Sequence, residues 1–475
     1  MGYVIGIDVG TTGTKAMLFS EKGACLKSAY RGYPLSAPQV GRVEQSAEDW
    51  WQAVGETVRE VCAGYGEQVT ALSLSTQGGT LVCVDKNGRP LAPAFVWNDS
   101  RCEEQAAAFA ARFGQSAMYE KTGWALFSGM PAMQICWIKD KQPALFHQTA
   151  LFLTVPDFLS LKMTGRAVVD NSNAGINQLT DIRQGCYDRD ILDFLDINES
   201  RLPSLSPSGA VVGNLTQEAA AFLGLTTKTL LISGAHDQYA VALGAGATRP
   251  GDILIGSGTA WVVTAMEETP NFSGLSQSRS AIPGLWGSLC SLSHGGVCLD
   301  WLRKNIVGTP EAPMSYETLN REVAQCKAAE EGLFFLPFGG RQNKAQFIGL
   351  DLSHNRFHIA KAVMEGVVFQ ITEMLGRFSV QSQSGLLLAG GASKSPVWTK
   401  LLCDISGLPV RIPQMPDLAC VGAAILAGWG AGLYQTPEEG YKALCVEETT
   451  IFPNTESVKT YAALFSQYKE LIKRY

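Results

Sequence analysis

The stretch Asp8-Val9-Gly10-Thr11-Thr12-Gly13-Thr14-Lys15 decides the fold of this 475-residue chain. Apolar runs precede it at Tyr3–Ile7 and follow it at Ala16–Phe19, so the pattern predicts a β-hairpin. A turn without β-carbons lets several backbone N–H groups converge on one anion, and threonine hydroxyls add donors without a competing charge. The turn therefore suits a polyphosphate, although a plain hairpin turn is also compatible with such a sequence.

This turn matches neither of two familiar nucleotide-binding loops. It lacks the pattern G-x-x-x-x-G-K-[ST], and no G-x-G-x-x-G leads into a helix. The carboxylate of Asp8, at the end of the first strand, is placed to hold Mg²⁺ through water, because Mg²⁺ keeps most of its hydration shell. The residues expected to contact phosphate are Gly10, Thr11, Thr12, Thr14 and Lys15.

The second half of the chain repeats this order weakly. Residues 252–263 again predict a strand, a turn and a strand, and the turn holds Gly256, Ser257, Gly258 and Thr259 as further phosphate contacts. After the apolar run 385–389, an adenine or ribose could be approached closely by Gly390, Gly391, Ala392 and Ser393, or these residues form an ordinary strand-to-helix turn. The repeat predicts two domains, 1–245 and 246–475, joined by the Gly/Pro-containing segment 244–251.

Asp237 is the candidate catalytic base. It follows the apolar run Leu230–Ile232, and a carboxylate at a strand end can accept the proton of a substrate hydroxyl. His236 is the rival, because imidazole is the commoner general base. Phosphoryl transfer to an alcohol needs only a modest base, which favours Asp237.

Composition limits the partners. The net charge is −6 and there is no run of Lys and Arg, so nucleic acid and anionic membrane are not expected partners. The twelve cysteines form no C-x-x-C pair, which indicates reduced thiols. The most apolar stretch, Cys420–Leu433, is short and interrupted by glycines, so we expect a buried helix and a cytoplasmic protein without an export signal. The oligomeric state stays open, with a homodimer as one alternative.

Five separated segments together resemble the FGGY carbohydrate kinases, within the actin/Hsp70/sugar-kinase superfamily, and the resemblance covers almost the whole chain. They are Asp8–Lys15, His236–Gln238, Gly256–Thr259, Ala345–Leu350 and His358–Gly366. Met130–Trp137 is similar to the N-terminal signature, except that Gln134 stands where a lysine is usual. The resemblance implies an α/β fold of two ribonuclease H-like domains with a central inter-domain cleft. It also implies ATP and Mg²⁺ as cofactors, a small sugar as the second substrate, and transfer of the γ-phosphate to a sugar hydroxyl.

The resemblance is less specific about the sugar. Glycerol kinases carry an Arg-Glu pair and xylulokinases a Met-His pair where this chain has Gly78 and Gly79. Trp97–Arg101 looks more like the xylulokinase-type members, so a ketopentose such as xylulose is expected; ribulose, fuculose, glycerol and autoinducer-2 type substrates are alternatives. The expected sugar contacts are Gln77, Gly78, Trp97, Asp99, Asp237 and Gln238, although a structural salt bridge explains Asp99 and Arg101 equally well.

Two rival functions share part of this pattern. An actin- or Hsp70-like ATPase has the phosphate hairpins but not the C-terminal signature, and it hydrolyses ATP without a sugar. A sugar-binding regulator descended from a kinase would not need Asp8 and Asp237.

Overall fold

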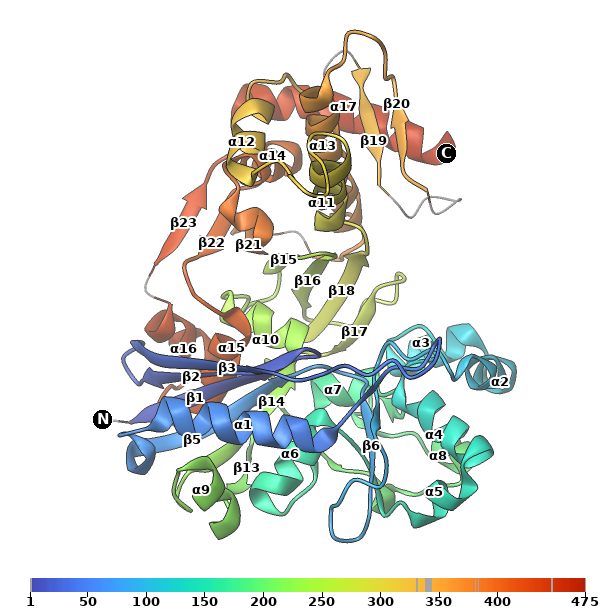
Figure 1. Ribbon diagram of the computed structural model, residues 1–475, viewed down its shortest axis with the longest axis vertical. Coiled ribbons are helices and arrows are strands. Elements are labelled where there is room, and N and C mark those ends of the chain that lie inside the picture. The colour runs from blue at the N-terminus through green and yellow to red at the C-terminus, as the bar shows by residue number, and fades with distance from the viewer. Residues whose placement is uncertain are drawn as a thin grey trace. The chain divides into compact units, whose positions relative to one another are not determined.

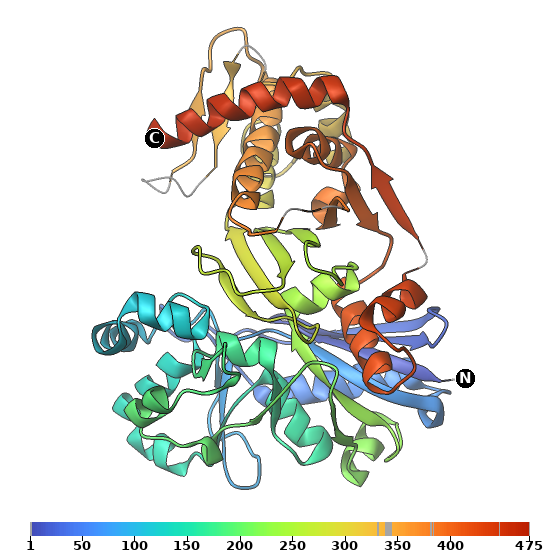
Figure 2. The same ribbon diagram turned by 180° about the vertical axis from the view of Figure 1, so that it is seen from behind.

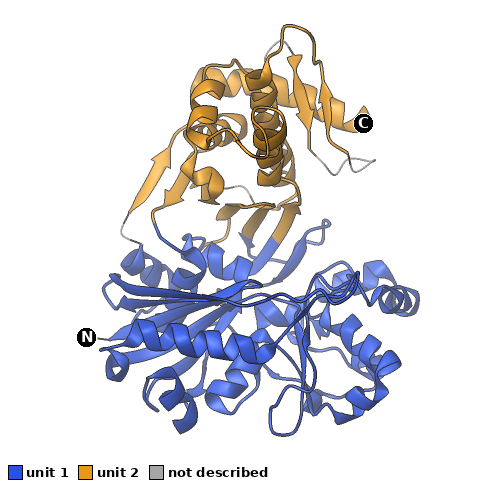
Figure 3. Cartoon of the chain, viewed as in Figure 1, with its two compact units in different colours: residues 1–248, 266–288, 415–446 blue, residues 249–265, 289–414, 447–475 orange. Residues whose placement is uncertain are grey.

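The computed structural model describes residues 2–329, 332–337, 344–380, 382, 384–445 and 447–474. The chain divides into two compact units, shown in Figure 3. Unit 1 comprises residues 1–248, 266–288 and 415–446, and unit 2 comprises residues 249–265, 289–414 and 447–475. The predicted boundary after residue 245 lies close to the first change of unit, but two later segments of the chain also belong to unit 1.

A six-stranded sheet forms the centre of unit 1. Its strands, in spatial order, are β13 (Val211–Asn214), β14 (Leu230–His236), β5 (Val69–Thr76), β1 (Tyr3–Val9), β2 (Gly13–Ser20) and β3 (Cys25–Gly32). β1 and β2 are antiparallel and join through the turn at residues 10–12, which confirms the predicted hairpin. β5 lies between β1 and β14 and is parallel to both.

Helices cover both faces of this sheet (Figure 1). α1 (Ala47–Cys62) and α6 (Val155–Thr164) lie on one face, and α10 (Asp237–Gly244) and α15 (Leu418–Gly430) lie on the other. α15 packs directly on β1, because a Cβ on Gly6 would lie 1.9 Å from the carbonyl oxygen of Cys420. The predicted buried helix near the C-terminus is therefore confirmed. Among the described helices, none is long and apolar enough to cross a membrane.

Unit 1 also contains a smaller, separate sheet. Its four strands, in spatial order, are β4 (Glu44–Gln45), β7 (Ala94–Phe95), β6 (Leu81–Val84) and β8 (Leu151–Thr154). β6 and β7 are antiparallel. The second apolar core of unit 1 is built around helices α2 (Glu103–Phe113), α3 (Gln115–Thr122), α4 (Pro131–Lys141), α5 (Pro143–Gln148) and α8 (Arg189–Leu195).

The remaining elements of unit 1 are short. One of them, β18, begins in unit 1, and its last residues belong to unit 2. They are β9 (Val168–Asp170), α7 (Asn171–Ile176), β10 (Thr180–Asp181), β11 (Cys186–Tyr187), β12 (Ser204–Ser206), α9 (Gln217–Leu223), β17 (Ser276–Arg279), β18 (Trp286–Leu292) and α16 (Pro437–Leu444).

Unit 2 repeats the central arrangement of unit 1. Its strands pair in the order β16 (Trp261–Glu267), β15 (Ile253–Ser257), β21 (Leu386–Gly390), β22 (Val410–Pro413) and β23 (Glu448–Ile451). β15 is antiparallel to β16 and parallel to β21, just as β1 is antiparallel to β2 and parallel to β5. The predicted repeat of hairpin and third strand is therefore confirmed.

Helices and one hairpin surround the strands of unit 2. These elements are α11 (Gly296–Asn305), α12 (Tyr316–Val323), β19 (Phe334–Leu336), β20 (Gln346–Ile348), α13 (Arg356–Leu375), α14 (Pro396–Ser406) and α17 (Thr455–Arg474). α17 packs against α13 and α14 (Figure 2). α13 approaches β19 closely at Gly366, where a Cβ would lie 2.1 Å from the carbonyl oxygen of Phe335, so this position of the C-terminal signature requires glycine.

Candidate active site

The carboxyl ends of three parallel strands meet at one edge of the sheet in unit 1. β1, β5 and β14 are neighbours there, and ligands of open α/β sheets bind at the carboxyl ends of strands. Asp8 is the second-last residue of β1, and Asp237 directly follows β14 at the start of α10. The sequence-predicted metal ligand and base therefore lie at the same sheet edge.

Asp8 has the character of a hard-cation ligand. Its Oδ1 accepts a hydrogen bond of 2.7 Å from Ser75. Burial raises its pKa from 3.8 to about 7, and the negative charges of Asp417 and Asp237 add to the rise. Carboxylate oxygens suit Mg²⁺, which takes one or two carboxylates and keeps several waters, so Asp8 fits this ion. Within the described ranges, no group of three or more His, Cys, Asp or Glu residues could hold a metal ion.

Only part of the first turn is available to a ligand. The N–H of Gly10 donates to the carbonyl of Gly13 at 3.0 Å and closes the turn. The hydroxyl of Thr11 donates to Gln77 at 3.0 Å and accepts from the indole of Trp97 at 3.2 Å, and Thr14 is fully buried. Thr12 is exposed. Among the described residues, the donors left without a partner are the Thr12 hydroxyl and the backbone N–H groups at the tip of the turn.

Lys15 is held by an ion pair that the sequence does not reveal. Its Nζ lies 3.0 Å from Oδ2 of Asp417, which caps the N-terminus of α15 by accepting a hydrogen bond from the N–H of Cys420. Both side chains are partly exposed, at 29% and 22%. A phosphate contact by Lys15 therefore competes with Asp417.

Asp237 and His236 form a pair at the end of β14. Nε2 of His236 lies 3.3 Å from Oδ1 of Asp237, whose side chain is 33% exposed. Oδ2 of Asp237 makes no hydrogen bond to any residue in the described part of the chain. A partly exposed carboxylate with one free oxygen is suited to accept a proton. His236 thus lies beside the carboxylate of Asp237, and Asp237 is the group placed to act as the base.

The predicted sugar contacts fall into two groups. Trp97 is 40% exposed, and Gln238 is partly exposed, so both side chains can reach a ligand. Gln77 is buried and hydrogen-bonded to Thr11 and Gln45, so it holds the first turn in place and is not available to a ligand.

Asp99 is the clearest correction to the expected sugar site. It is fully buried, and its carboxylate accepts hydrogen bonds from the guanidinium of Arg101 at 2.7 Å and from the N–H of Val43 at 2.7 Å. Arg101 also pairs with Glu44 at 2.7 Å. The bonds from Arg101 and Val43 at 2.7 Å are accepted by Oδ2 of Asp99, and Oδ1 accepts from the backbone N–H and the Nε of Arg101, both at 2.9 Å. Both oxygens are therefore satisfied inside the protein, and the geometry supports the structural salt bridge.

The surroundings of Gln134 account for a glutamine at the position where the N-terminal signature usually has a lysine. Its side chain is fully buried, and its Nε2 donates to the carbonyl of Gly129 at 2.7 Å and to those of Phe95 and Val96 at 3.3 and 3.4 Å. An uncharged amide satisfies these backbone groups without burying a charge. Gln134 therefore fixes the segment that leads into Trp97.

The second turn, in unit 2, uses its residues differently. Ser257 is buried, donates to the carbonyl of Ala389 at 2.5 Å and accepts from the N–H of Ala392 at 3.0 Å. Its hydroxyl therefore joins the turn to the segment after β21 and is not free for phosphate. Gly258 and Thr259 are exposed, and Gly256 is partly exposed. The N-terminus of α11 packs against this turn, since a Cβ on Gly296 would lie 2.4 Å from the carbonyl oxygen of Gly258. Helix N-termini favour anions.

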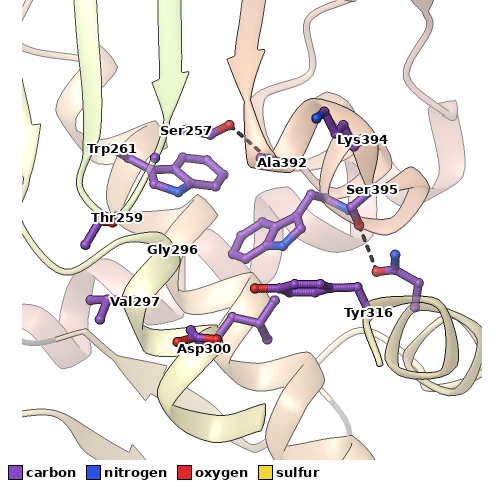
Figure 4. A pocket seen from close by; sticks show the side chains of 15 residues that line it. Ser257, Thr259, Trp261, Gly296, Val297, Asp300, Tyr316, Ala392, Lys394 and Ser395 are labelled. Atoms are coloured by element: carbon purple, nitrogen blue, oxygen red, sulfur yellow. Dashed lines mark hydrogen bonds between the residues drawn. The ribbon is translucent and has the colours of Figure 1, made fainter. Parts of the chain in front are cut away.

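A cavity of about 470 Å³ lies beside the second turn (Figure 4). Of the four predicted adenosine contacts, Gly391 and Ala392 line it, whereas Gly390 and Ser393 do not. Gly390 has φ +91°, and a Cβ there would lie 2.6 Å from the carbonyl oxygen of Ser257, so its role is to shape the backbone.

Several residues that line this cavity were not predicted from the sequence. They are Trp261, Asp300, Tyr316, Asn320 and Trp398. The rings of Trp261 and Trp398 lie 4.9 Å apart, and Tyr316 is 53% exposed. Of these five, only Trp261 had a local signal, because it lies two residues after the second turn. A cavity of this size with aromatic walls suits a nucleoside.

Comparisons with known proteins bear on the family and the fold. The profile of the "FGGY family of carbohydrate kinases, N-terminal domain" matches residues 3–244, and that of the C-terminal domain matches residues 254–431. The chain is 29% identical to the xylulose kinase of Bacillus subtilis (strain 168), over 99% of this chain and 97% of that protein. It is 28% identical to the L-xylulose/3-keto-L-gulonate kinase of Escherichia coli (strain K12), over 99% and 96%. The crystal structure of xylulose kinase from Rhodospirillum rubrum superposes with a TM-score of 0.91 and 28% identity, over 99% and 98%.

Proposed function

The chain belongs to the FGGY family of carbohydrate kinases, so it is an ATP-dependent sugar kinase, and we propose that its acceptor is a ketopentose such as xylulose. Relatives that cover nearly the whole chain act on xylulose or 3-keto-L-gulonate, which supports an open-chain ketose. Ribulose, fuculose, glycerol and autoinducer-2 type substrates are the alternatives, because Gly78 and Gly79 carry neither marker pair.

The relatives carry the proposed acceptor, and the placement of Asp8 and Asp237 at one sheet edge, with an oxygen of Asp237 free, carries the proposed chemistry. As the sugar hydroxyl oxygen bonds to the γ-phosphorus, its proton passes to Asp237, and the bond to the leaving ADP oxygen breaks. Trp97 and Gln238 are proposed to contact the sugar, whereas the carboxylate of Asp99 is held by Arg101 inside the protein. Gly78 is proposed to act by leaving space beside His236.

Nucleotide contacts are proposed in each unit separately. In unit 1, the backbone of residues 10–12, the hydroxyl of Thr12 and the ammonium of Lys15 bind phosphate. In unit 2, Gly258 and Thr259 bind phosphate, and the cavity beside Gly391 and Ala392 binds the nucleoside. Mg²⁺ held near Asp8 would neutralise phosphate charge when bound.

We propose a cytoplasmic location as well. All twelve cysteines are free thiols. Free thiols are typical of reducing compartments.

A substrate screen tests the proposed acceptor. ADP release is measured with ATP and Mg²⁺ alone and with D-xylulose, L-xylulose, D-ribulose or glycerol. We expect a ketose to give the largest stimulation. ADP release that is equal with and without every sugar would support an actin- or Hsp70-like ATPase instead.

A further inference from the structure

The two ring nitrogens of His236 have different surroundings. Its side chain is 8% exposed, and Nε2 lies 3.3 Å from Oδ1 of Asp237. Nδ1 is buried and has no hydrogen-bond partner among the described residues. Buried polar atoms without a partner are rare and call for an explanation such as a ligand. The unused nitrogen sits on the residue next to the proposed base.

The ring of His236 is fixed from several sides. Its backbone N–H donates to the hydroxyl of Ser172 at 2.8 Å, and Ser172 bonds in turn to buried Asp170. The rings of Trp124 and Tyr239 lie edge-on, with centroids 6.4 and 5.7 Å from the imidazole centroid. The imidazole therefore cannot turn freely to find another partner.

Gly78 provides the space that the ring occupies. A Cβ on Gly78 would lie 2.7 Å from Cδ2 and 3.0 Å from Nε2 of His236, and 3.1 Å from Ile176. Gly78 does not have a positive φ, so the backbone conformation does not demand glycine. Glycine is needed there for space alone. A side chain at position 78 would therefore collide with the imidazole where it now lies.

We propose that His236 both recognises the substrate and positions the base. Its Nδ1 accepts a hydrogen bond from a sugar hydroxyl, while its Nε2–H donates to Oδ1 of Asp237 and leaves Oδ2 directed at the hydroxyl that is phosphorylated. The inference rests on the proposed function, because the recognised group belongs to the acceptor sugar. A neutral imidazole that donates from Nε2 has only an acceptor at Nδ1, so this point of the site selects a hydroxyl donor.

Two amide substitutions separate the two roles. In His236→Gln the amide nitrogen can reach the place of Nε2 and keep Asp237 in position, but the acceptor at Nδ1 is lost. We expect KM for D-xylulose to rise about tenfold with kcat nearly unchanged. In His236→Asn the amide oxygen lies near the place of Nδ1, but the contact with Asp237 is lost. We expect kcat to fall about tenfold with KM nearly unchanged.

The matched control is His147→Gln, because His147 is an exposed histidine on α5. It should change neither constant. A wild-type KM in His236→Gln would overturn the recognition role, and a wild-type kcat in His236→Asn would overturn the positioning role. Equal losses in both constants for both variants would mean that the ring acts only by packing.

A second pair of measurements does not depend on turnover. Melting temperatures of Gly78→Ala, His236→Ala and the double variant form a cycle, and Gly78→Ala should destabilise the wild type more than the His236→Ala background. Nitrogen NMR of labelled histidine should show Nδ1 without a proton. Additive melting shifts or a protonated Nδ1 would overturn the arrangement. If the wild type phosphorylates no sugar, the proposed function fails, and the cycle and the NMR spectrum still decide the placement and tautomer of His236.

Discussion

The two turns, residues 8–15 in unit 1 and 256–259 in unit 2, share one backbone plan and differ in their side-chain partners. Each follows a strand that is antiparallel to the next strand and parallel to a third. In the first turn, Thr11 is bonded to Gln77, and Lys15 is paired with Asp417. In the second, Ser257 turns inward to the segment after β21, and the exposed residues lie beside the aromatic cavity.

The difference shows how one scaffold serves two tasks. Near the first turn, the negative charges of Asp237 and Asp417 act on the carboxyl of Asp8. This environment suits an approaching cation, and the free oxygen of Asp237 suits proton transfer. The second has Trp261, Tyr316 and Trp398 nearby, which suits retention of a nucleoside. Loss of a carboxylate near the first turn should therefore act mainly on kcat, and loss of an aromatic residue of the cavity mainly on the KM for ATP.

The largest effect is expected for Asp237→Ala. Loss of a general base lowers kcat by roughly 10²–10⁴-fold, and ATP binding should be unchanged because the nucleoside cavity lies in unit 2. A coupled ADP-release assay and calorimetric titration with ATP measure the two quantities. Asp190→Ala, at an exposed position on α8, is the control. Turnover at the wild-type rate in Asp237→Ala would show that Asp237 is not the base.

The next effect is a pH dependence of the Mg²⁺ requirement, of about tenfold per pH unit below pH 7. The raised pKa of Asp8, about 7, means that the carboxyl is protonated below that pH and charged above it. Protons therefore compete with Mg²⁺ below pH 7, and the Mg²⁺ concentration for half-maximal activity should fall by about tenfold per unit as the pH rises toward 7, then level off.

Asp417→Asn distinguishes this titration from that of ATP itself. The negative charge of Asp417 raises the pKa of Asp8, so its removal should move the break in the profile to lower pH, whereas the titration of ATP is unaffected. An identical profile in wild type and Asp417→Asn would assign the break to ATP.

A several-fold effect is expected at the cavity of unit 2. Tyr316 is half exposed and lines the cavity, so Tyr316→Ala should raise the KM for ATP by about 2–10-fold through lost stacking, with kcat unchanged. Trp301→Ala removes an exposed aromatic residue of α11 outside the lining and serves as the control. Similar KM values for the two variants would argue against nucleoside binding in this cavity.

The smallest effect concerns stability. The pair of Lys15 and Asp417 is partly exposed, so Lys15→Met should lower the free energy of unfolding by at most about 1 kcal/mol. Thr259→Ala, at the exposed end of the second turn, should change it by less than about 0.5 kcal/mol. Urea unfolding of both variants measures the difference, and a larger loss for Thr259→Ala would contradict the contrast between the two turns.

Local patterns explain what could be predicted from the sequence. Apolar runs on either side of glycine turns are enough to locate both hairpins, and the glycine-rich apolar run is enough to locate α15. The placement of Asp237 after a buried strand was also readable, because strand ends expose the next side chain.

Contacts between distant segments explain what could not be predicted. Lys15 and Asp417 are 402 positions apart, and the cavity in unit 2 draws on α11, α12 and α14, which share no sequence pattern. Asp99 looked like a ligand because its neighbours are Trp97 and Arg101. Its real partners include the backbone of Val43, which only the folded chain brings close.

The most direct measurement counts products. Wild-type protein is incubated with ATP, Mg²⁺ and D-xylulose, and phosphorus NMR quantifies sugar phosphate, ADP and inorganic phosphate. A kinase in which Asp237 activates the sugar hydroxyl predicts one sugar monophosphate for each ADP and almost no inorganic phosphate. ADP and inorganic phosphate in equal amounts, without sugar phosphate, would contradict it.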